Sequence, residues 1–151
     1  MIRFVRTLAH LCLFVGIAIG RLAGCASGPR LVTVNGKVLL KDGTPVKNGT
    51  VTFHPDTSKG NQSKEVPIGA IRDGEYAIKT GVKDGAPLGA YRVSISAADD
   101  VNPDDPYKTV WYADEKYVNV DTSKLTADVA DNPEPGRYDF KLDPHPKAKK
   151  K

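Results

Sequence analysis

The sequence predicts an all-β protein, a seven-stranded antiparallel β-sandwich formed by a single domain. Short segments in which apolar and polar residues alternate recur along the chain, and a period of two is typical of strands buried on one face. Turn-forming residues separate these segments, and the 151 residues include 14 Gly and 11 Pro. No stretch shows the 3.6-residue periodicity of a convincing amphipathic helix, so the strands are expected to supply the core.

The first half of the chain carries four of the seven predicted strands. Their inward-facing residues are expected to be Val32, Val34, Val38 and Leu40, then Val51 and Phe53, then Val66, Ile68 and Ala70, and then Tyr76 and Ile78. A turn over 42–45 (Asp-Gly-Thr-Pro) follows the first strand, and a polar loop over 56–64 follows the second. Asp73-Gly74 is the signal for a two-residue hairpin.

The second half carries the remaining three strands. Residues 80–89 contain three glycines and Pro87, and they are expected to form a loop. The inward-facing residues after it are expected to be Tyr91, Val93, Ile95 and Ala97, then Leu125, Ala127 and Val129, and then Tyr138, Phe140 and Leu142. A chain of this length buries roughly 65% of its unfolded surface, which is enough for one core.

The net charge of +4 is unevenly distributed along the chain. Residues 1–24 contain three arginines and no acid, and residues 147–151 contain four lysines, so the body between them carries a net charge of −3. A nucleic-acid-binding domain carries its basic residues in a stripe on the folded surface. We therefore expect no nucleic-acid partner. Residues 144–151 are expected to form a basic, flexible tail.

The N-terminus has the pattern of a secretory signal peptide. Arg3 and Arg6 form a short positive region, and an apolar run over 8–20 follows it. This run is too short to span a hydrocarbon core of ~30 Å, which needs about 20 helical residues, and it has the length of a signal-peptide core. An uncleaved anchor helix, with Cys25 as an ordinary thiol, is the alternative.

The apolar run ends in Leu22-Ala23-Gly24-Cys25, which resembles the lipobox of bacterial lipoproteins. The resemblance implies that residues 1–24 are a lipoprotein signal peptide, that Cys25 is lipidated, and that residues 25–30 are a tether. Cys12 would be removed with the signal peptide. Three acyl chains exceed the two that stable anchoring requires. The implied location is the cell envelope, anchored by lipid to a bacterial membrane and facing the periplasm or the cell surface.

Several further motifs occur in a fixed order behind the lipobox. Val-Asn-Gly-Lys-Val at 34–38, Asp-Gly-Thr-Pro-Val at 42–46 and Gly-Thr-Val-Thr-Phe at 49–53 come first, and Asp-Gly-Glu-Tyr at 73–76 and Pro-Leu-Gly-Ala-Tyr-Arg-Val at 87–93 follow. Together with 116–117, 122–129 and 138–142, these segments resemble carboxypeptidase regulatory-like domains of bacterial lipoproteins. The resemblance covers about residues 32–142.

That family implies a fold and a role. The fold is a transthyretin-like (prealbumin-like) β-sandwich, expected here over residues 31–143. The family brings no catalytic residues, and its members act as structural, adhesive or accessory modules.

The sequence gives little support for an enzyme. His54 and His145 would be the histidines of the mature chain, and two isolated histidines do not make a zinc site, which needs three or four ligands. The gly-x-ser-x-gly motif of a nucleophile elbow is absent from the sequence. We therefore expect no catalytic residues, no confident metal site and no cofactor. A hydrolase with an unrecognised site is the alternative, because the members of a triad need not be close in sequence.

The long connection over 99–124 holds the candidate ligand-binding residues. Calcium prefers clustered carboxylates, and the candidate calcium ligands are Asp99, Asp100, Asp104 and Asp105. Their spacing does not match an EF-hand, and a solvated turn shaped by prolines is the alternative. Trp111 and Tyr112 are candidate contacts for a sugar ring or a partner. The alternative is that Trp111 and Tyr117 cover an open end of the core.

These observations together predict a non-catalytic, lipid-anchored cell-envelope protein that acts as a structural or protein-interaction module. A carbohydrate-binding accessory module that uses the 99–124 loop is the alternative. The expected partners are the membrane, through the lipid anchor, and envelope proteins or polysaccharide.

Overall fold

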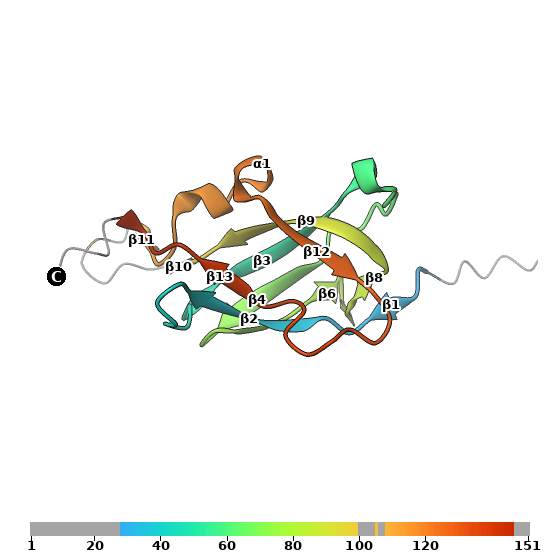
Figure 1. Ribbon diagram of the computed structural model, residues 1–151, viewed down its shortest axis with the longest axis horizontal. Helices are drawn as coiled ribbons and strands as arrows, with labels where there is room; N and C mark the ends of the chain where they lie inside the picture. Colours follow the sequence, from blue (N-terminus) through green and yellow to red (C-terminus); the bar gives the residue numbers. More distant parts are fainter. Residues whose placement is uncertain (1–27, 100–104, 106–107, 147–151) are drawn as a thin grey trace, which may run out of the picture.

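The computed structural model describes residues 28–99, 105 and 108–146, and strands dominate this part of the chain (Figure 1), which confirms the all-β prediction. The strands are β1 (Leu31–Val32), β2 (Asn35–Leu40), β3 (Asn48–Pro55), β4 (Ile68–Arg72), β5 (Glu75–Ala77), β6 (Lys79–Thr80), β7 (Lys83–Asp84), β8 (Ala86–Pro87), β9 (Gly89–Ser96), β10 (Ala98–Asp99), β11 (Val110–Trp111), β12 (Leu125–Val129) and β13 (Phe140–Leu142). The helical turns are η1 (Thr57–Lys59), η2 (Glu115–Tyr117) and α1 (Val120–Ser123).

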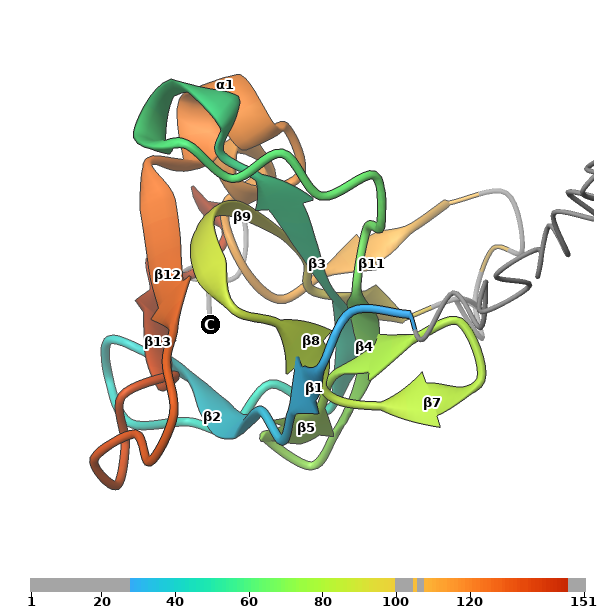
Figure 2. The ribbon, with the colours of Figure 1, turned by 90° about the vertical axis from the view of Figure 1, so that its right-hand side faces the viewer.

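One curled sheet organises the fold, with the strand order β12-β9-β3-β4-β5-β2-β13. All neighbours along this path are antiparallel except the last pair, because β13 runs parallel to β2 with Leu142 beside Leu40. The expectation of a purely antiparallel arrangement is therefore wrong at this edge. Figure 2 shows the sheet curling so that its edge strands β12 and β13 lie on the same side of the molecule.

The Asp73-Gly74 dipeptide forms the predicted hairpin turn between β4 and β5. Asp73 has a φ of 49° and Gly74 a φ of 83°, and a type I′ turn requires such positive values at both central residues. Their amides donate to the carbonyls of Lys47 and Val46 over 2.8 Å each. The turn therefore also fixes the hairpin to the chain that enters β3.

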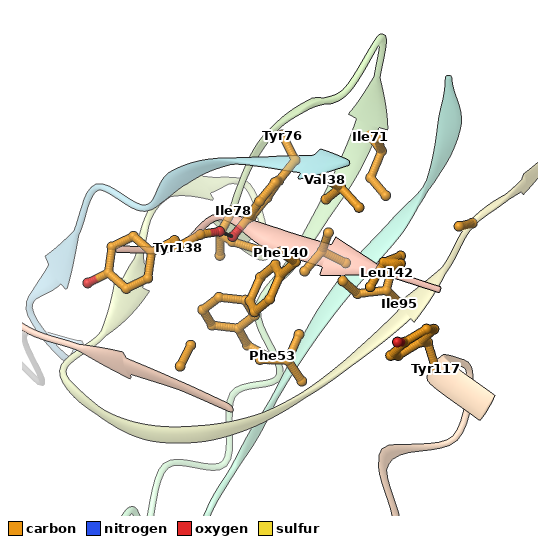
Figure 3. Close-up of a cluster of buried hydrophobic side chains, with 14 of the residues drawn as sticks. Val38, Phe53, Ile71, Tyr76, Ile78, Ile95, Tyr117, Tyr138, Phe140 and Leu142 are labelled. Carbon is orange, nitrogen blue, oxygen red and sulfur yellow. Dashed lines mark hydrogen bonds between the residues drawn. The ribbon is translucent and has the colours of Figure 1, made fainter. Parts of the chain in front are cut away.

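The hydrophobic core lies inside the curl of the sheet (Figure 3). The predicted inward-facing residues that are buried there are Val34, Val38, Leu40, Val51, Phe53, Tyr76, Ile78, Tyr91, Val93, Ile95, Ala97, Ala127, Val129, Tyr138, Phe140 and Leu142. The Tyr76 hydroxyl donates to the carbonyl of Tyr138 over 2.7 Å, and the Tyr91 hydroxyl donates to that of Pro87 over 2.8 Å. The polar ends of these two rings are thus satisfied inside an apolar core.

The predicted orientation of the third strand is wrong by one residue. Val66, Ile68 and Ala70 were expected to point inward, but all three are exposed, and Ile71 takes the buried position on β4. Gly69 also faces inward, because a Cβ there would clash with the carbonyl of Ala77. The inner face of β4 therefore contains a residue with no side chain, and the more regular apolar alternation lies on its outer face.

The expected loop over 80–89 contains short strands. β6 and β7 form a hairpin in which Thr80 pairs with Lys83, and β8 pairs with β1 so that Ala86 lies beside Val32. Strands of two residues are too short to show a period of two, so the sequence pattern could not reveal them.

The first and last strands delimit the sheet-forming part of the chain. β1 begins at Leu31 and β13 ends at Leu142. The chain continues in regular contacts into the predicted tail, since Pro144 bridges Ala113 and the amide of His145 donates to the carbonyl of Tyr112 over 2.9 Å. Residues 1–27, including the predicted signal peptide and Cys25, lie outside the described residues. β1 lies at one end of the longest axis, and β10 and β11 lie toward the other (Figure 1).

Candidate functional site

A broad depression of the described surface is a groove on the outer face of β2, β4 and β5, with a volume of about 1060 Å³. We name it the outer groove. Ala70 and Ala77 present small side chains on its floor, and Gly36 and Gly69, whose Cα hydrogens face the core, contribute backbone. Small residues at the centre of a sheet face leave the backbone accessible to a ligand. The two alanines therefore leave little side-chain volume over this part of the sheet.

Charged side chains surround this floor. Lys37, Arg72 and Lys79 supply positive charge, and Glu75 and Asp139 supply negative charge. The Asp139 carboxylate accepts a hydrogen bond from the backbone amide of Lys37 over 2.8 Å, which fixes the 136–139 segment beside β2. The outer groove thus combines an apolar centre with charges of both signs, a composition suited to a polar polymer or an extended peptide.

A second, smaller pocket of about 320 Å³ lies beside the β10–β11 hairpin. Trp111 and Asp99 line it together with the hydroxyl-bearing residues Thr50 and Ser96. Thr50 also lines the outer groove, so the two depressions adjoin on β3. A half-exposed indole beside hydroxyl and carboxylate groups is an arrangement that can stack on and hydrogen-bond a sugar ring.

The structure separates the two aromatic candidates of the 99–124 connection. Trp111 lines the small pocket, but Tyr112 packs against the hydrophobic core. Burial, followed by the hydrogen bond to Asp99 and the charge of that carboxylate, raises the pKa of Tyr112 to about 12. Tyr117 is also buried in the core. This agrees with the alternative in which Tyr117 covers an open end of the core. Of these two candidates, only Trp111 therefore lines the small pocket.

Asp143 fixes this covering segment to β13. Its carboxylate accepts hydrogen bonds from Lys116 Nζ over 2.7 Å and from the Tyr117 hydroxyl over 2.8 Å, and it forms an ion pair with Lys41 Nζ over 2.6 Å. The hydrogen bonds from Lys116, Lys41 and Tyr117, in that order, hold the pKa of Asp143 well below its ordinary value. The network therefore has a structural role, because it joins η2, β13 and the turn after β2.

The structure describes two of the four candidate calcium ligands. Asp99 accepts a hydrogen bond from the side-chain amide of Asn48 over 2.6 Å, and hydrogen bonds from Tyr112 and Asn48 lower its pKa. Asp105 lies 3.4 Å from Lys108 Nζ in an ion pair. Asp100 and Asp104 lie outside the described residues, and among those that are described no group of three or more metal-binding side chains occurs. Calcium binding by this loop stays a prediction.

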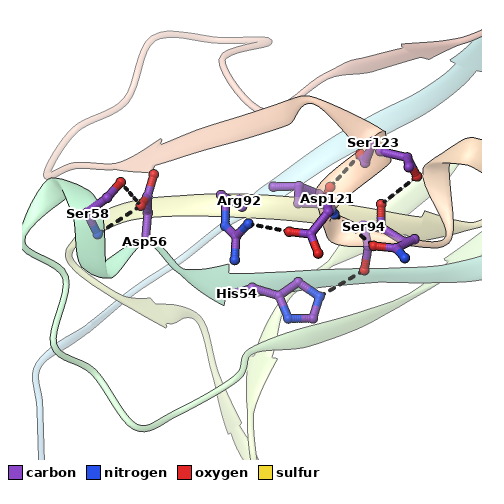
Figure 4. A network of polar contacts seen from close by, with 10 residues as sticks. His54, Asp56, Ser58, Arg92, Ser94, Asp121 and Ser123 are labelled. Carbon is purple, nitrogen blue, oxygen red and sulfur yellow. Dashed lines mark hydrogen bonds and ion pairs between the residues drawn. The ribbon is translucent and has the colours of Figure 1, made fainter.

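A serine and a histidine meet on the outer face of β3 and β9 (Figure 4). His54 Nε2 lies 2.9 Å from Ser94 Oγ, and Ser94 is only 8% exposed. Burial and then the nearby charge of Arg92 lower the pKa of His54, so the ring is neutral near pH 7. Sequence reasoning did not predict this pair, because the two residues are cross-strand neighbours on β3 and β9 that lie 40 residues apart in the chain.

The charges around this pair do not complete a nucleophilic site. The carboxylate of Asp121 forms a 2.7 Å ion pair with Arg92, as Figure 4 shows, rather than orienting the His54 ring. Ser123 Oγ donates to the carbonyl of Val93 over 2.6 Å and holds α1 against β9. Activation of Ser94 would need a third group to orient the histidine and donors for an oxyanion. We therefore interpret the contacts as a network that joins β3, β9 and α1.

Comparison with known protein families, with curated proteins and with solved structures finds no match. Within residues 28–99, 105 and 108–146, no helix is long and apolar enough to cross a membrane.

Proposed function

We propose that the protein is a non-catalytic, lipid-anchored component of the bacterial cell envelope whose β-domain binds an envelope partner through the outer groove. The groove, with its floor of Gly36, Gly69, Ala70 and Ala77 and its charged rim, is the observation that carries this proposal. Main-chain and small side-chain atoms on its floor suit an extended segment, and the charges on its rim suit polar contacts. The domain would thus act as an interaction module.

The proposed fold is the transthyretin-like sandwich of carboxypeptidase regulatory-like domains. Its support is the order of the motifs over 32–142 and the strand-dominated structure. The proposed location rests on Leu22-Ala23-Gly24-Cys25 behind a short apolar run. Lipidation of Cys25 would attach the domain stably to a membrane.

The anchor is tested by the intact mass of the N-terminal peptide of protein purified from its native membrane. We expect a lipidated Cys25 with residues 1–24 removed. An unmodified Met1, or an unlipidated N-terminus, would refute the anchor.

The groove is tested by photo-crosslinking in intact cells. A photoreactive amino acid replaces Ala77 on the groove floor in one variant and Thr126 on the exposed face of β12 in the matched control. Both positions are exposed, so neither replacement disturbs the core. We expect a discrete crosslinked product from position 77 alone. Identical products from both positions, or none from either, would count against the groove as the binding surface.

A carbohydrate-binding accessory function is the second candidate, and the small pocket favours it. Trp111 is the only tryptophan of the chain, so its fluorescence reports directly on that pocket. Envelope polysaccharide fragments added to the protein should shift this fluorescence if a sugar stacks on the indole. An unchanged spectrum across a broad glycan panel would remove this candidate without affecting the outer groove.

A further inference from the structure

We propose that the β6–β7 hairpin is a membrane-contacting tip, and that Val82 at its turn enters the headgroup region of the bilayer to which Cys25 anchors the chain. This inference rests on the proposed function, because it requires the lipid anchor. Beyond the anchor, the inference specifies which end of the domain faces the lipid and which residue enters the bilayer.

Exposed apolar side chains lie in and beside the β6–β7 hairpin. The large apolar residues that are most exposed are Val66, Ile68, Val82, Leu88 and Val118. Val82 lies in the turn between β6 and β7, Ile68 lies opposite Lys79 of β6, and Leu88 directly follows β8. Single exposed apolar residues are common, but a group of them marks an interaction surface.

Val82 is the extreme member of this group, with 95% of its surface exposed. Gly81 precedes it with a φ of 59°, and Thr80 pairs with Lys83, which is the arrangement of a two-residue type II′ turn. A Cβ added at Gly81 would meet no atom within 4 Å. The turn therefore projects Val82 away from the rest of the domain. The pairing of β6 with β4 as well as with β7 holds the hairpin in place.

The chain connects this hairpin directly to the anchor. Only Gly85 separates β7 from β8, and β8 pairs with β1. Cys25 precedes Leu31 by six residues, so the anchor lies at most ~22 Å from the start of β1 even when the tether is fully extended. Val82 precedes Ala86 by four residues and lies at most ~14 Å from it. Figure 2 shows β1 beside β8, with β7 to their right. The short tether therefore keeps the hairpin within reach of the bilayer.

The charges beside the turn fit an anionic bilayer surface. Lys79 and Lys83 lie on either side of Val82, and Lys83 is exposed. Lys79 shares its charge with Asp84 in an ion pair of 3.1 Å. Lysine side chains reach toward lipid headgroups while an apolar neighbour sits deeper, and a negatively charged leaflet attracts them. An apolar tip between two lysines therefore matches the chemistry of the headgroup region.

The test measures the depth of two labelled positions in the full-length protein purified from membranes. Val82→Cys introduces a thiol at the hairpin, and Thr109→Cys is the matched control beside β11, at the opposite end of the domain (Figure 1). Each introduced thiol is the only free one in the mature lipidated chain, because Cys12 is removed and Cys25 carries lipid. Both variants receive a bimane fluorophore and are reconstituted in vesicles of phosphatidylethanolamine and phosphatidylglycerol.

The label at position 82 should be quenched by nitroxide-bearing lipids and several-fold less by aqueous acrylamide than the label at position 109. Equal acrylamide quenching at the two positions, with no quenching by nitroxide lipids, would overturn the hairpin proposal. The N-terminal mass of the same preparation separates the two hypotheses. A lipidated Cys25 with a water-exposed label at position 82 rejects only the hairpin, whereas an unmodified N-terminus rejects the anchor and the hairpin together.

Discussion

Replacing Gly36 with alanine should strongly destabilise the domain, although the change adds one methyl group. Gly36 lies on β2 opposite Tyr76, and its backbone is outside the left-handed region, so the φ angle itself carries no penalty. A Cβ at this position would lie 2.8 Å from Cε1 of Tyr76 and would clash with the carbonyl oxygen of Tyr138. Both neighbours are buried, and neither is the flexible end of a long side chain.

The magnitude follows from what the clash displaces. The Tyr138 carbonyl accepts a 2.7 Å hydrogen bond from the Tyr76 hydroxyl, and separating these buried groups costs about 1–3 kcal/mol. Overpacking of the core adds about 1–3 kcal/mol. The lower flexibility of alanine in the unfolded chain returns about 0.5–1 kcal/mol. The free energy of unfolding should therefore fall by about 1–5 kcal/mol, a large part of the ~5–15 kcal/mol typical of a domain.

Urea denaturation followed by circular dichroism and by Trp111 fluorescence measures this change. Gly28→Ala is the matched control, because a Cβ at Gly28 would meet no atom within 4 Å and its φ is also outside the left-handed region. We expect the midpoint of the control to equal that of the unmodified protein and the midpoint of Gly36→Ala to fall well below it. Equal midpoints for the two variants would refute the described packing of Tyr76 and Tyr138 behind β2.

Three further predictions concern the core and two titrating groups. Phe53→Ala removes a fully buried ring and should lower the free energy of unfolding by about 3–5 kcal/mol. Val82→Ala, at a 95% exposed position, should change it by less than about 0.5 kcal/mol. Similar urea midpoints for the two variants would contradict the burial of Phe53 in the core. Because hydrogen bonds lower the pKa of Asp143 from 3.8, its contribution to stability is present above that value and is lost as the pH falls below it. Asp143→Asn should therefore lose less stability than the unmodified protein below about pH 4, and parallel acid-unfolding curves would count against this network. Burial and Arg92 lower the pKa of His54 from 6.5, so its contribution is complete above pH 6.5 and declines as the pH falls through the lowered value. Arg92→Gln should raise the His54 pKa measured by NMR only part of the way to 6.5, because burial is the larger cause, and an unchanged pKa would exclude an electrostatic effect of Arg92.

The alternation of apolar residues predicted most of the core, because strands with one buried face leave this trace in the sequence. Val93 and Ile95 on β9 show the pattern clearly. The pattern failed on β4, where Ile68 and Ala70 alternate on the exposed face and Gly69 occupies an inner position that has no room for a side chain. The pattern depends on apolar side chains, so it cannot identify a buried glycine as an inward-facing position. The parallel pairing of β13 with β2 was also missed, since alternation gives no information about strand direction.

The outer groove could not be predicted, because the residues around it come from separate segments and share no motif. Lys37 lies on β2, Arg72 on β4 and Asp139 just before β13, and only the pairing of these strands brings them together. The glycines and alanines of the floor also form no recognisable sequence motif, since these residues carry no functional group. Trp111 in the 99–124 connection could be predicted as a candidate ligand contact, because a large aromatic residue among turn-forming residues is conspicuous. The burial of Tyr112 and Tyr117 depends on the tertiary packing of that connection.

The parallel pairing of β2 with β13 also determines when the domain can finish folding. β2 is among the first strands to be synthesised, and its partner β13 is the last. A chain that still lacks residues 140–142 has an unpaired edge at β2 and an open core where Phe140 and Leu142 belong. Assembly therefore cannot finish while the final segment is still inside the ribosome or a translocation channel. For a protein exported as we propose, the late synthesis of β13 would keep the polypeptide incompletely folded until its translocation across the membrane is complete.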